Sequence, residues 1–111
     1  MSRRIVTRPR FSRDLVEQFA FIAADKLAPA ERFLKVAADS IERLADMPGI
    51  GRVWESPLPH LAGVRVYPMP SGFRSYLIFY RLLDGGIELL ALIHGSRDLA
   101  AVLDSLSLDE T

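Results

Sequence analysis

Two apolar segments separated by a turn decide the fold of this chain: Arg74-Ser-Tyr-Leu-Ile-Phe-Tyr-Arg81 and Ile87-Glu-Leu-Leu-Ala-Leu-Ile-His94. Both are rich in β-branched, aromatic and aliphatic residues, which favour a pleated, half-buried strand. Asp84-Gly85-Gly86 lies between them and is typical of the tight turn of a β-hairpin. The sequence therefore predicts an antiparallel hairpin over residues 74–94.

The turn also predicts which side chains share a face of this hairpin. A two-residue turn at Asp84-Gly85 or at Gly85-Gly86 pairs odd positions of one strand with even positions of the other. One face, expected to pack on helices, then holds Tyr76, Ile78, Tyr80, Leu82, Ile87, Leu89, Ala91 and Ile93. The opposite face holds Ser75, Leu77, Phe79, Arg81, Glu88, Leu90, Leu92 and His94, with Arg81 and Glu88 placed to pair across the strands. Because this second face is too apolar to be fully solvated, we expect a C-terminal helix or another chain to cover it.

A strand and two helices are predicted before the hairpin. The short β-branched segment Arg4–Thr7 is predicted as the first strand. Ser12 is expected to cap the following helix, with Asp14 in its first turn. Pro29 is expected to open a second helix that ends at Met47-Pro48-Gly49, so almost no loop joins the two helices. Their apolar stripes are Leu15, Val16, Phe19, Ile22 and Ala23 in the first helix, and Ala30, Phe33, Leu34, Ala37, Ile41 and Leu44 in the second.

A loop rich in proline and glycine leads from the helices to the sheet. It covers residues 48–63, and Trp54 within it is expected to cover an edge of the core. Val64–Tyr67 is predicted as a strand, and Asp98 as the N-cap of a last short helix with Leu99, Val102, Leu103 and Leu106 on its apolar side. The order of elements predicts one α+β domain over residues 1–111. In it an N-terminal strand and a helical hairpin pack on a small, mainly antiparallel twisted sheet, followed by a short C-terminal helix.

The distribution of charge is more informative than its sum. The 111 residues include 14 basic and 14 acidic side chains, so no net charge attracts nucleic acid or an anionic membrane. Twelve of the basic residues are arginines, concentrated before Asp14 and between Gly51 and Arg81. The last eight residues carry only acids, namely Asp104, Asp109 and Glu110. Since arginine forms bidentate contacts with carboxylates and phosphates, this distribution favours a structured interface.

The composition limits the classes of protein and the compartment. With 50% hydrophobic and 25% charged residues, the chain is typical of a globular domain. It has no cysteine, so disulfides, thiolate metal sites and cysteine nucleophiles are excluded, as is usual in a reducing cytosol. The longest apolar run, Phe19–Ala24, is too short to span a bilayer, and the N-terminus does not resemble a secretory signal. We therefore expect a cytoplasmic protein with no membrane partner.

Few residues indicate catalysis. No nucleophile elbow, phosphate-binding loop or dinucleotide motif is present, and His60 and His94 do not have the spacing of a zinc site, so neither metal nor cofactor is expected. His94, Ser96 and Asp98 are too close in sequence for a catalytic triad. His94 is interpreted as a strand-end histidine bonded to a backbone carbonyl, with a general acid–base role as the alternative. Arg97 is interpreted as a tether of the chain turn, with a phosphate clamp as the alternative.

Three motifs, in order and at these spacings, resemble a known family. They are Met47-Pro-Gly-Ile-Gly-Arg52, Phe73-Arg-Ser-Tyr-Leu-Ile-Phe-Tyr-Arg81 and Ile93-His-Gly-Ser-Arg-Asp98. Over residues 3 to 104 the chain resembles the RelE/ParE superfamily of bacterial toxins from type II toxin–antitoxin systems, and most closely its ParE branch. The resemblance implies a toxin, of the kind that stabilises plasmids, which arrests growth by trapping the cleaved-DNA state of DNA gyrase or a related type II topoisomerase. It also implies a hetero-oligomer with a cognate antitoxin, expected to combine a ribbon-helix-helix DNA-binding half with a segment that folds across the toxin.

Two other functions are compatible with this resemblance. Toxins of the RelE branch cleave mRNA in the ribosomal A site, which needs a base, a proton donor and cations that stabilise a charged phosphorane. Here these roles would fall to Arg65, Arg81, His94 and Arg97, with His94 expected near Arg81 and Arg97 on the second face of the hairpin. However, both lysines lie in the predicted helices. The segment after Asp98 has no lysine, arginine or tyrosine, and the chain is neutral overall. These departures favour the ParE branch. The third function is that of an inactive relative that only binds its antitoxin.

In a ParE-like toxin the important residues form a protein–protein surface and not a catalytic centre, and nucleic acid is contacted only indirectly. We expect this surface at the rim of the sheet and in the C-terminal segment. There an antitoxin could lay a helix into an apolar groove or extend the sheet edge. An acidic antitoxin would suit the excess of arginine. The candidate partner-binding residues are Arg65, Arg74, Leu77, Phe79, Arg81, Leu90, Leu92, His94, Arg97 and Asp98.

Overall fold

A computed structural model describes residues 3–106 of the chain and contains one five-stranded sheet with strand order β1-β5-β4-β3-β2. The acidic residues Asp109 and Glu110 lie outside the described residues. The strands are β1 (Arg4–Thr7), β2 (Arg52–Val53), β3 (Arg65–Pro68), β4 (Tyr76–Leu83) and β5 (Gly86–His94). The helices are α1 (Pro9–Asp25), α2 (Leu27–Asp46) and α3 (Leu99–Asp104), with short 3-10 turns η1 (Pro48–Ile50) and η2 (Pro59–Leu61). The α+β fold is confirmed, and the two-residue strand β2 is an addition to the predicted sheet.

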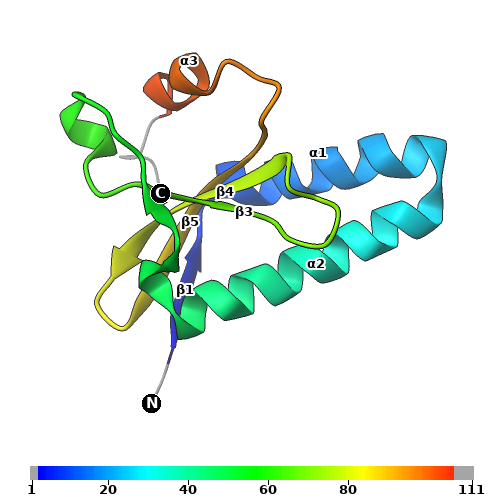
Figure 1. The fold of residues 1–111 in the computed structure, drawn as a ribbon, viewed down its shortest axis with the longest axis horizontal. Helices are drawn as coiled ribbons and strands as arrows, with labels where there is room; N and C mark the ends of the chain where they lie inside the picture. The colour runs from blue at the N-terminus through cyan, green and yellow to red at the C-terminus, as the bar shows by residue number, and fades with distance from the viewer. Residues whose placement is uncertain (1–2, 107–111) are drawn as a thin grey trace.

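The sheet lies between the α1–α2 helices and α3 (Figure 1). It separates two hydrophobic cores, one on each of its faces. β1 pairs with β5 in parallel, and all the other pairs are antiparallel. On one face the α1–α2 hairpin packs through Phe11, Phe33 and Leu44 against the sheet. On the other face α3 and the loop before β3 pack through Leu103 and Leu61. Burial of large apolar side chains on both faces is the main stabilising contribution, at about 1.5–3 kcal/mol for each.

The first helix begins earlier than the sequence predicts. Pro9 occupies its first turn, and the preceding Arg8 provides no side-chain cap. Proline suits this position because its fixed φ is helical and its missing N–H has no partner to lose there. The prediction that Ser12 is the N-cap is therefore wrong, and Asp14 lies beyond the first turn, where it is buried. The second helix likewise begins at Leu27, two residues before the expected Pro29.

The apolar stripes of both helices are narrower than predicted. Leu15 and Ile22 pack against the core between the sheet and the α1–α2 helices, but Val16 is 65% exposed and Leu34 is 38% exposed. Each helix contacts the sheet and the other helix on only part of its circumference, so the outer members of a wide stripe remain in solvent.

A β-bulge corrects the predicted faces of the hairpin. Leu83 pairs with Gly86, so the turn is Asp84-Gly85, one of the two predicted registers. The register shifts between Phe79 and Tyr80: Tyr80 is opposite Leu89, Phe79 is opposite Ala91, and Leu90 is the extra residue. Such a bulge reverses the alternation of all residues beyond it. The predicted face is therefore wrong for two pairs of residues. Ala91 and Ile93 join the core on the α3 side of the sheet, and Leu92 and His94 lie on the side of the α1–α2 helices.

The second face of the sheet is covered from within the chain. Leu103 and Leu106 are buried there beside Phe79, and Trp54 contacts Phe79 edge to face, with ring centroids 5.5 Å apart. The expected cover over the core edge by Trp54 is thus confirmed. Within the described residues the C-terminal helix and the loop cover this face, so the alternative in which another chain covers it is not needed.

The hydroxyl of Tyr80 anchors the loop between α2 and β2. Although its ring is fully buried, this hydroxyl accepts a hydrogen bond from the Gly51 N–H at 2.8 Å and donates one to the Pro48 carbonyl at 2.6 Å. Burial raises the pKa of Tyr80, which keeps the phenol protonated and able to donate. A Cβ atom on Gly51 would overlap the Tyr80 ring, which explains the glycine at this position.

Removal of this hydroxyl is expected to destabilise the protein by about 1–3 kcal/mol, because Tyr80→Phe leaves the Gly51 N–H and the Pro48 carbonyl without their partner. Urea denaturation followed by circular dichroism measures the change. Tyr67→Phe is the matched control, since the half-buried Tyr67 hydroxyl makes no hydrogen bond within residues 3–106. Equal stability of the two variants would contradict the anchoring role.

Candidate functional site

Three of the predicted partner-binding residues are core residues. Phe79, Leu90 and Leu92 are at most 1% exposed, and Leu77 is half-buried against the α3-side core. These side chains stabilise the two cores and are not available to a partner in this structure. The prediction that these side chains form part of an exposed binding surface is therefore corrected. The bulge turns Leu92 toward the α1–α2 helices, and α3 covers the face that holds Leu77, Phe79 and Leu90.

The predicted arginines have different roles. Arg65 donates hydrogen bonds to the carbonyls of Gly51 at 2.7 Å and Gly49 at 3.3 Å, so it holds the loop after α2. Arg81 forms the predicted ion pair with Glu88 at 2.7 Å. The remaining two, Arg74 and Arg97, are exposed and form no ion pair with any residue of the range 3–106.

The four groups suggested for RNA cleavage do not come together. Tyr76 pairs with His94 at one end of the β4–β5 hairpin, whereas Arg81 pairs with Glu88 five residues further along β4. Five residues of strand correspond to roughly 17 Å. The bulge also places His94 and Arg81 on opposite faces of the sheet, so the expected proximity of His94 to Arg81 is wrong.

His94, Ser96 and Asp98 form no triad. The Nδ1 atom of His94 accepts a hydrogen bond from the Ser96 N–H at 3.1 Å and lies 2.8 Å from the Ser96 hydroxyl. Asp98 accepts from the Ala101 N–H at 3.2 Å and is the predicted N-cap of α3. The partner of His94 is thus Ser96, in place of the expected backbone carbonyl.

A groove lies between α1 and the end of β5, beside some of the predicted residues. It consists of two hollows of about 420 and 220 Å³ that share Glu17, Gln18 and His94. Phe21 and Tyr76 line the first hollow, and Arg10, Arg13 and Arg97 line the second. We call the two hollows together the α1–β5 groove. Of the predicted residues, His94 and Arg97 lie in it.

Asp14 forms the floor of this groove and was missed as a site residue. Its carboxylate accepts the Leu92 N–H at 3.0 Å and the Arg10 Nε–H at 2.8 and 2.9 Å. Burial raises the pKa of Asp14, partly offset by the hydrogen bonds from Leu92 and Arg10. One signal in the sequence could have found it: Asp14 is three residues after Phe11, on the same side of a helix that begins at Pro9.

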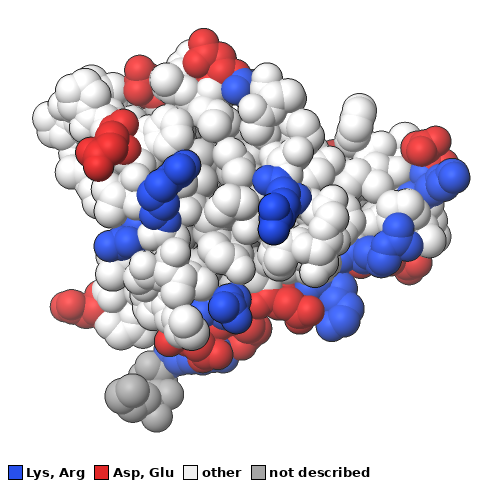
Figure 2. Space-filling model, in the orientation of Figure 1, with Lys and Arg blue, Asp and Glu red and all other residues white. Residues whose placement is uncertain are grey.

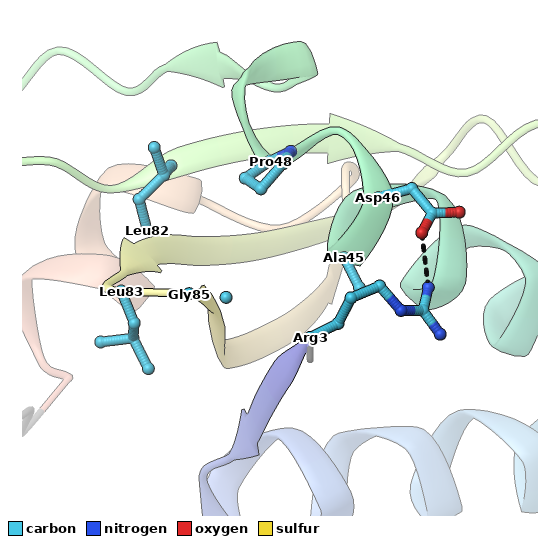
Figure 3. Close-up of a pocket in the computed structure, with 8 residues that line it drawn as sticks. Arg3, Ala45, Asp46, Pro48, Leu82, Leu83 and Gly85 are labelled. Atoms are coloured by element: carbon cyan, nitrogen blue, oxygen red, sulfur yellow. Dashed lines mark hydrogen bonds and ion pairs between the residues drawn. The ribbon is translucent and has the colours of Figure 1, made fainter. Parts of the chain in front are cut away.

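A second concavity lies at the other end of the sheet. It measures about 510 Å³ and is lined by residues of the N-terminal strand region, the end of α2 and the β4–β5 turn (Figure 3). Arg3, one of its lining residues, forms ion pairs with Glu42 at 2.6 Å and Asp46 at 2.7 Å. Hydrogen bonds to Glu42 and Asp46 raise the pKa of Arg3. The pairs connect the start of the chain to α2, but both are exposed to solvent, which screens them, so they contribute little to stability.

The charged surface is mixed in sign. Basic and acidic side chains lie side by side along the lower edge of the face shown in Figure 2, and most of the middle of that face is uncharged.

Among residues 3–106, no three His, Cys, Asp or Glu side chains come together as a metal site. In the same part of the chain, no helix is long and apolar enough to span a membrane.

Comparison with known proteins identifies related toxins. The family model described as "ParE toxin of type II toxin-antitoxin system, parDE" matches residues 5–99. A chain of the structure described as "Chromosomal ParDE TA system from P. aeruginosa" shares the fold, with a TM-score of 0.62 and 14% sequence identity. The alignment covers 81% of this chain and 92% of that one. No curated protein sequence matches significantly.

Proposed function

The chain belongs to the ParE toxin family of type II toxin–antitoxin systems, and we propose that it inhibits DNA gyrase or a related type II topoisomerase and is neutralised by a cognate antitoxin. The observation that carries this proposal is the family match over residues 5–99, which includes both long helices and every strand except the first residue of β1. Inhibition of a topoisomerase requires contact with a protein in the cell interior, so we propose a cytoplasmic location. The antitoxin is proposed to be of the ribbon-helix-helix type.

The side-chain arrangement favours inhibition by binding over RNA cleavage. Phosphodiester cleavage needs a base and cations around one phosphate. Here Arg81 is paired with Glu88, Arg65 holds backbone carbonyls, and His94 is roughly 17 Å along the hairpin from Arg81. The RelE-like ribonuclease therefore remains only an alternative, as does an inactive relative that binds its antitoxin.

Two assays on the same purified protein, freed of antitoxin, test the proposal. The first incubates it with DNA gyrase, supercoiled DNA and ATP, and measures linear DNA after denaturation of the protein. The second incubates it with translating ribosomes and measures intact mRNA. We expect gyrase-dependent DNA breaks that increase with the amount of toxin, together with intact mRNA.

The other outcomes assign the alternatives. Cleaved mRNA with unaffected gyrase would support the RelE-like ribonuclease, and Arg97 and His94 would then be the first residues to replace. No effect in either assay, from a folded chain that still binds a cognate antitoxin, would support the inactive relative. A denatured sample of the chain is the control for contaminating nucleases.

A further inference from the structure

The α1–β5 groove has the length of a peptide-binding site. Arg13 and Phe21, which line its two hollows, are eight residues apart on α1 and hence about 12 Å apart along the helix axis. An extended peptide of about four residues, or about two turns of a helix, covers this length. Phe21 is 75% exposed, the most exposed of the large hydrophobic side chains described.

The groove cannot accept a partner by simple extension of the sheet. β1 ends opposite Leu89. Beyond that point the edge of β5 that faces away from β4 has no strand beside it. The Leu92 N–H on that side is already bonded to the Asp14 carboxylate at 3.0 Å. An added strand would have to displace a buried carboxylate from two partners, Leu92 and Arg10, so recognition must depend on side chains.

The cations of the groove are unevenly neutralised. Arg10 is held by Asp14, but Arg13 and Arg97 form no ion pair within the described part of the chain. Both line the smaller hollow, so one end of the groove has two available guanidinium groups. Glu17 lines both hollows and is also without an ion pair among residues 3–106. Arg13 and Arg97 therefore favour a carboxylate placed beside them, whereas Glu17 repels one placed next to its own side chain.

His94 adds a directional donor. Because its Nδ1 accepts the Ser96 N–H, the ring proton of the neutral form lies on Nε2. Within residues 3–106 this Nε2–H donates no hydrogen bond. This N–H is available to a carbonyl of an occupant beside Tyr76. The Tyr76 and His94 rings lie edge to face, with their centroids 4.9 Å apart.

We propose that the α1–β5 groove binds a peptide segment of the antitoxin. The segment places a carboxylate at Arg13 and Arg97, a backbone carbonyl at His94 and a large apolar side chain on Phe21. This inference rests on the proposed function and adds to it the place and chemistry of one contact. A nucleic acid strand fits less well, because Asp14 and Glu17 line the groove and repel a continuous row of phosphates.

The test measures the affinity of the full chain for its purified cognate antitoxin, sought as the product of a short reading frame beside its gene, by calorimetry at several salt concentrations. The groove variants are Arg13→Gln with Arg97→Gln, and Phe21→Ser. We expect each to weaken binding at least about tenfold, and the double arginine variant also to reduce the salt dependence of the affinity. The matched controls are Arg32→Gln with Arg43→Gln, two exposed arginines of α2, and Val16→Ser, an exposed apolar residue of α1 outside the groove. They should change the affinity less than about twofold.

Each other outcome has a defined meaning. Groove variants that bind like the controls would overturn this inference and leave the proposed function intact, whereas an unmodified chain that binds no antitoxin would overturn the antitoxin part of the proposed function itself. If the unmodified chain dimerises alone and Phe21→Ser abolishes the dimer, the occupant is a second copy and the inference is wrong. Should a variant fail to fold, a photo-crosslinking amino acid at position 21 decides the question, since crosslinks to the antitoxin support the groove and their absence contradicts it.

Discussion

Gly86→Ala is expected to destabilise the protein by about 3 kcal/mol or more, the largest effect of any single methyl group considered for this fold. Gly86 begins β5 and lies opposite Arg4 of β1 in the parallel pair. A Cβ atom there would overlap the carbonyl of Arg4, a backbone atom that cannot rotate away. The substitution must therefore separate β1 from β5 and weaken the bond from the Arg4 N–H to the Gly85 carbonyl, 2.8 Å long in this structure.

Urea denaturation measures this loss against a matched glycine variant. Gly49→Ala is the control, because a Cβ atom on Gly49 meets nothing within 4 Å and its φ is not positive. We expect Gly49→Ala to leave the stability within about 0.5 kcal/mol, or to raise it slightly by restricting the unfolded chain. A midpoint for Gly86→Ala equal to that of the control would mean that β1 does not lie against β5 as described.

Asp14→Ala is expected to destabilise the protein by about 2–4 kcal/mol. The substitution leaves the Leu92 N–H without an acceptor in a buried position and leaves Arg10 without its partner. Asp14→Asn should cost less, because an amide oxygen can still accept from Leu92. Asp39→Ala removes an exposed i,i+4 pair with Lys35 and is the surface control, expected to change the stability by less than about 0.5 kcal/mol.

The pH dependence of Asp14 has a defined sign. Burial raises its pKa in the folded protein above the ordinary value of 3.8, so in the window above pH 3.8 the folded state binds more protons than the unfolded state. The contribution of Asp14 to the unfolding free energy is therefore greatest below pH 3.8, and it decreases as the pH rises through the folded-state pKa. Relative to Asp14→Asn, the unmodified protein should therefore lose unfolding free energy as the pH rises from 3.5 to 7. A difference in unfolding free energy between the two proteins that stays constant over this pH range would show that the hydrogen bonds from Leu92 and Arg10 cancel the effect of burial on the pKa of Asp14.

The α1–β5 groove also depends on Asp14, which links the stability prediction for Asp14 to the proposed binding. The carboxylate connects α1 to the part of β5 that β1 does not reach, and so keeps Arg13 and Phe21 beside His94. Asp14→Ala is expected to weaken antitoxin binding as well as folding. Stability and affinity measured on the same samples separate the two effects.

Local sequence determined the elements of this protein. The strands of the β4–β5 hairpin, the turn at Asp84-Gly85, the Arg81–Glu88 pair and the Asp98 cap depend on residues close in sequence, or on a register that a two-residue turn imposes. The early start of α1 also has a local signal in the sequence, since Pro9 suits the first turn of a helix.

Tertiary structure alone decided the candidate site. The bulge at Leu90 reverses the faces of Leu92 and His94, and no local preference signals it, because its stability depends on packing between two cores on opposite sides of the sheet. The burial of Asp14 has the same origin: its partner Leu92 is 78 residues away in sequence, and the N–H needs an acceptor only because β1 ends at Thr7. The groove that joins Arg13, Phe21, His94 and Arg97 exists because these long-range contacts place α1 against the end of β5.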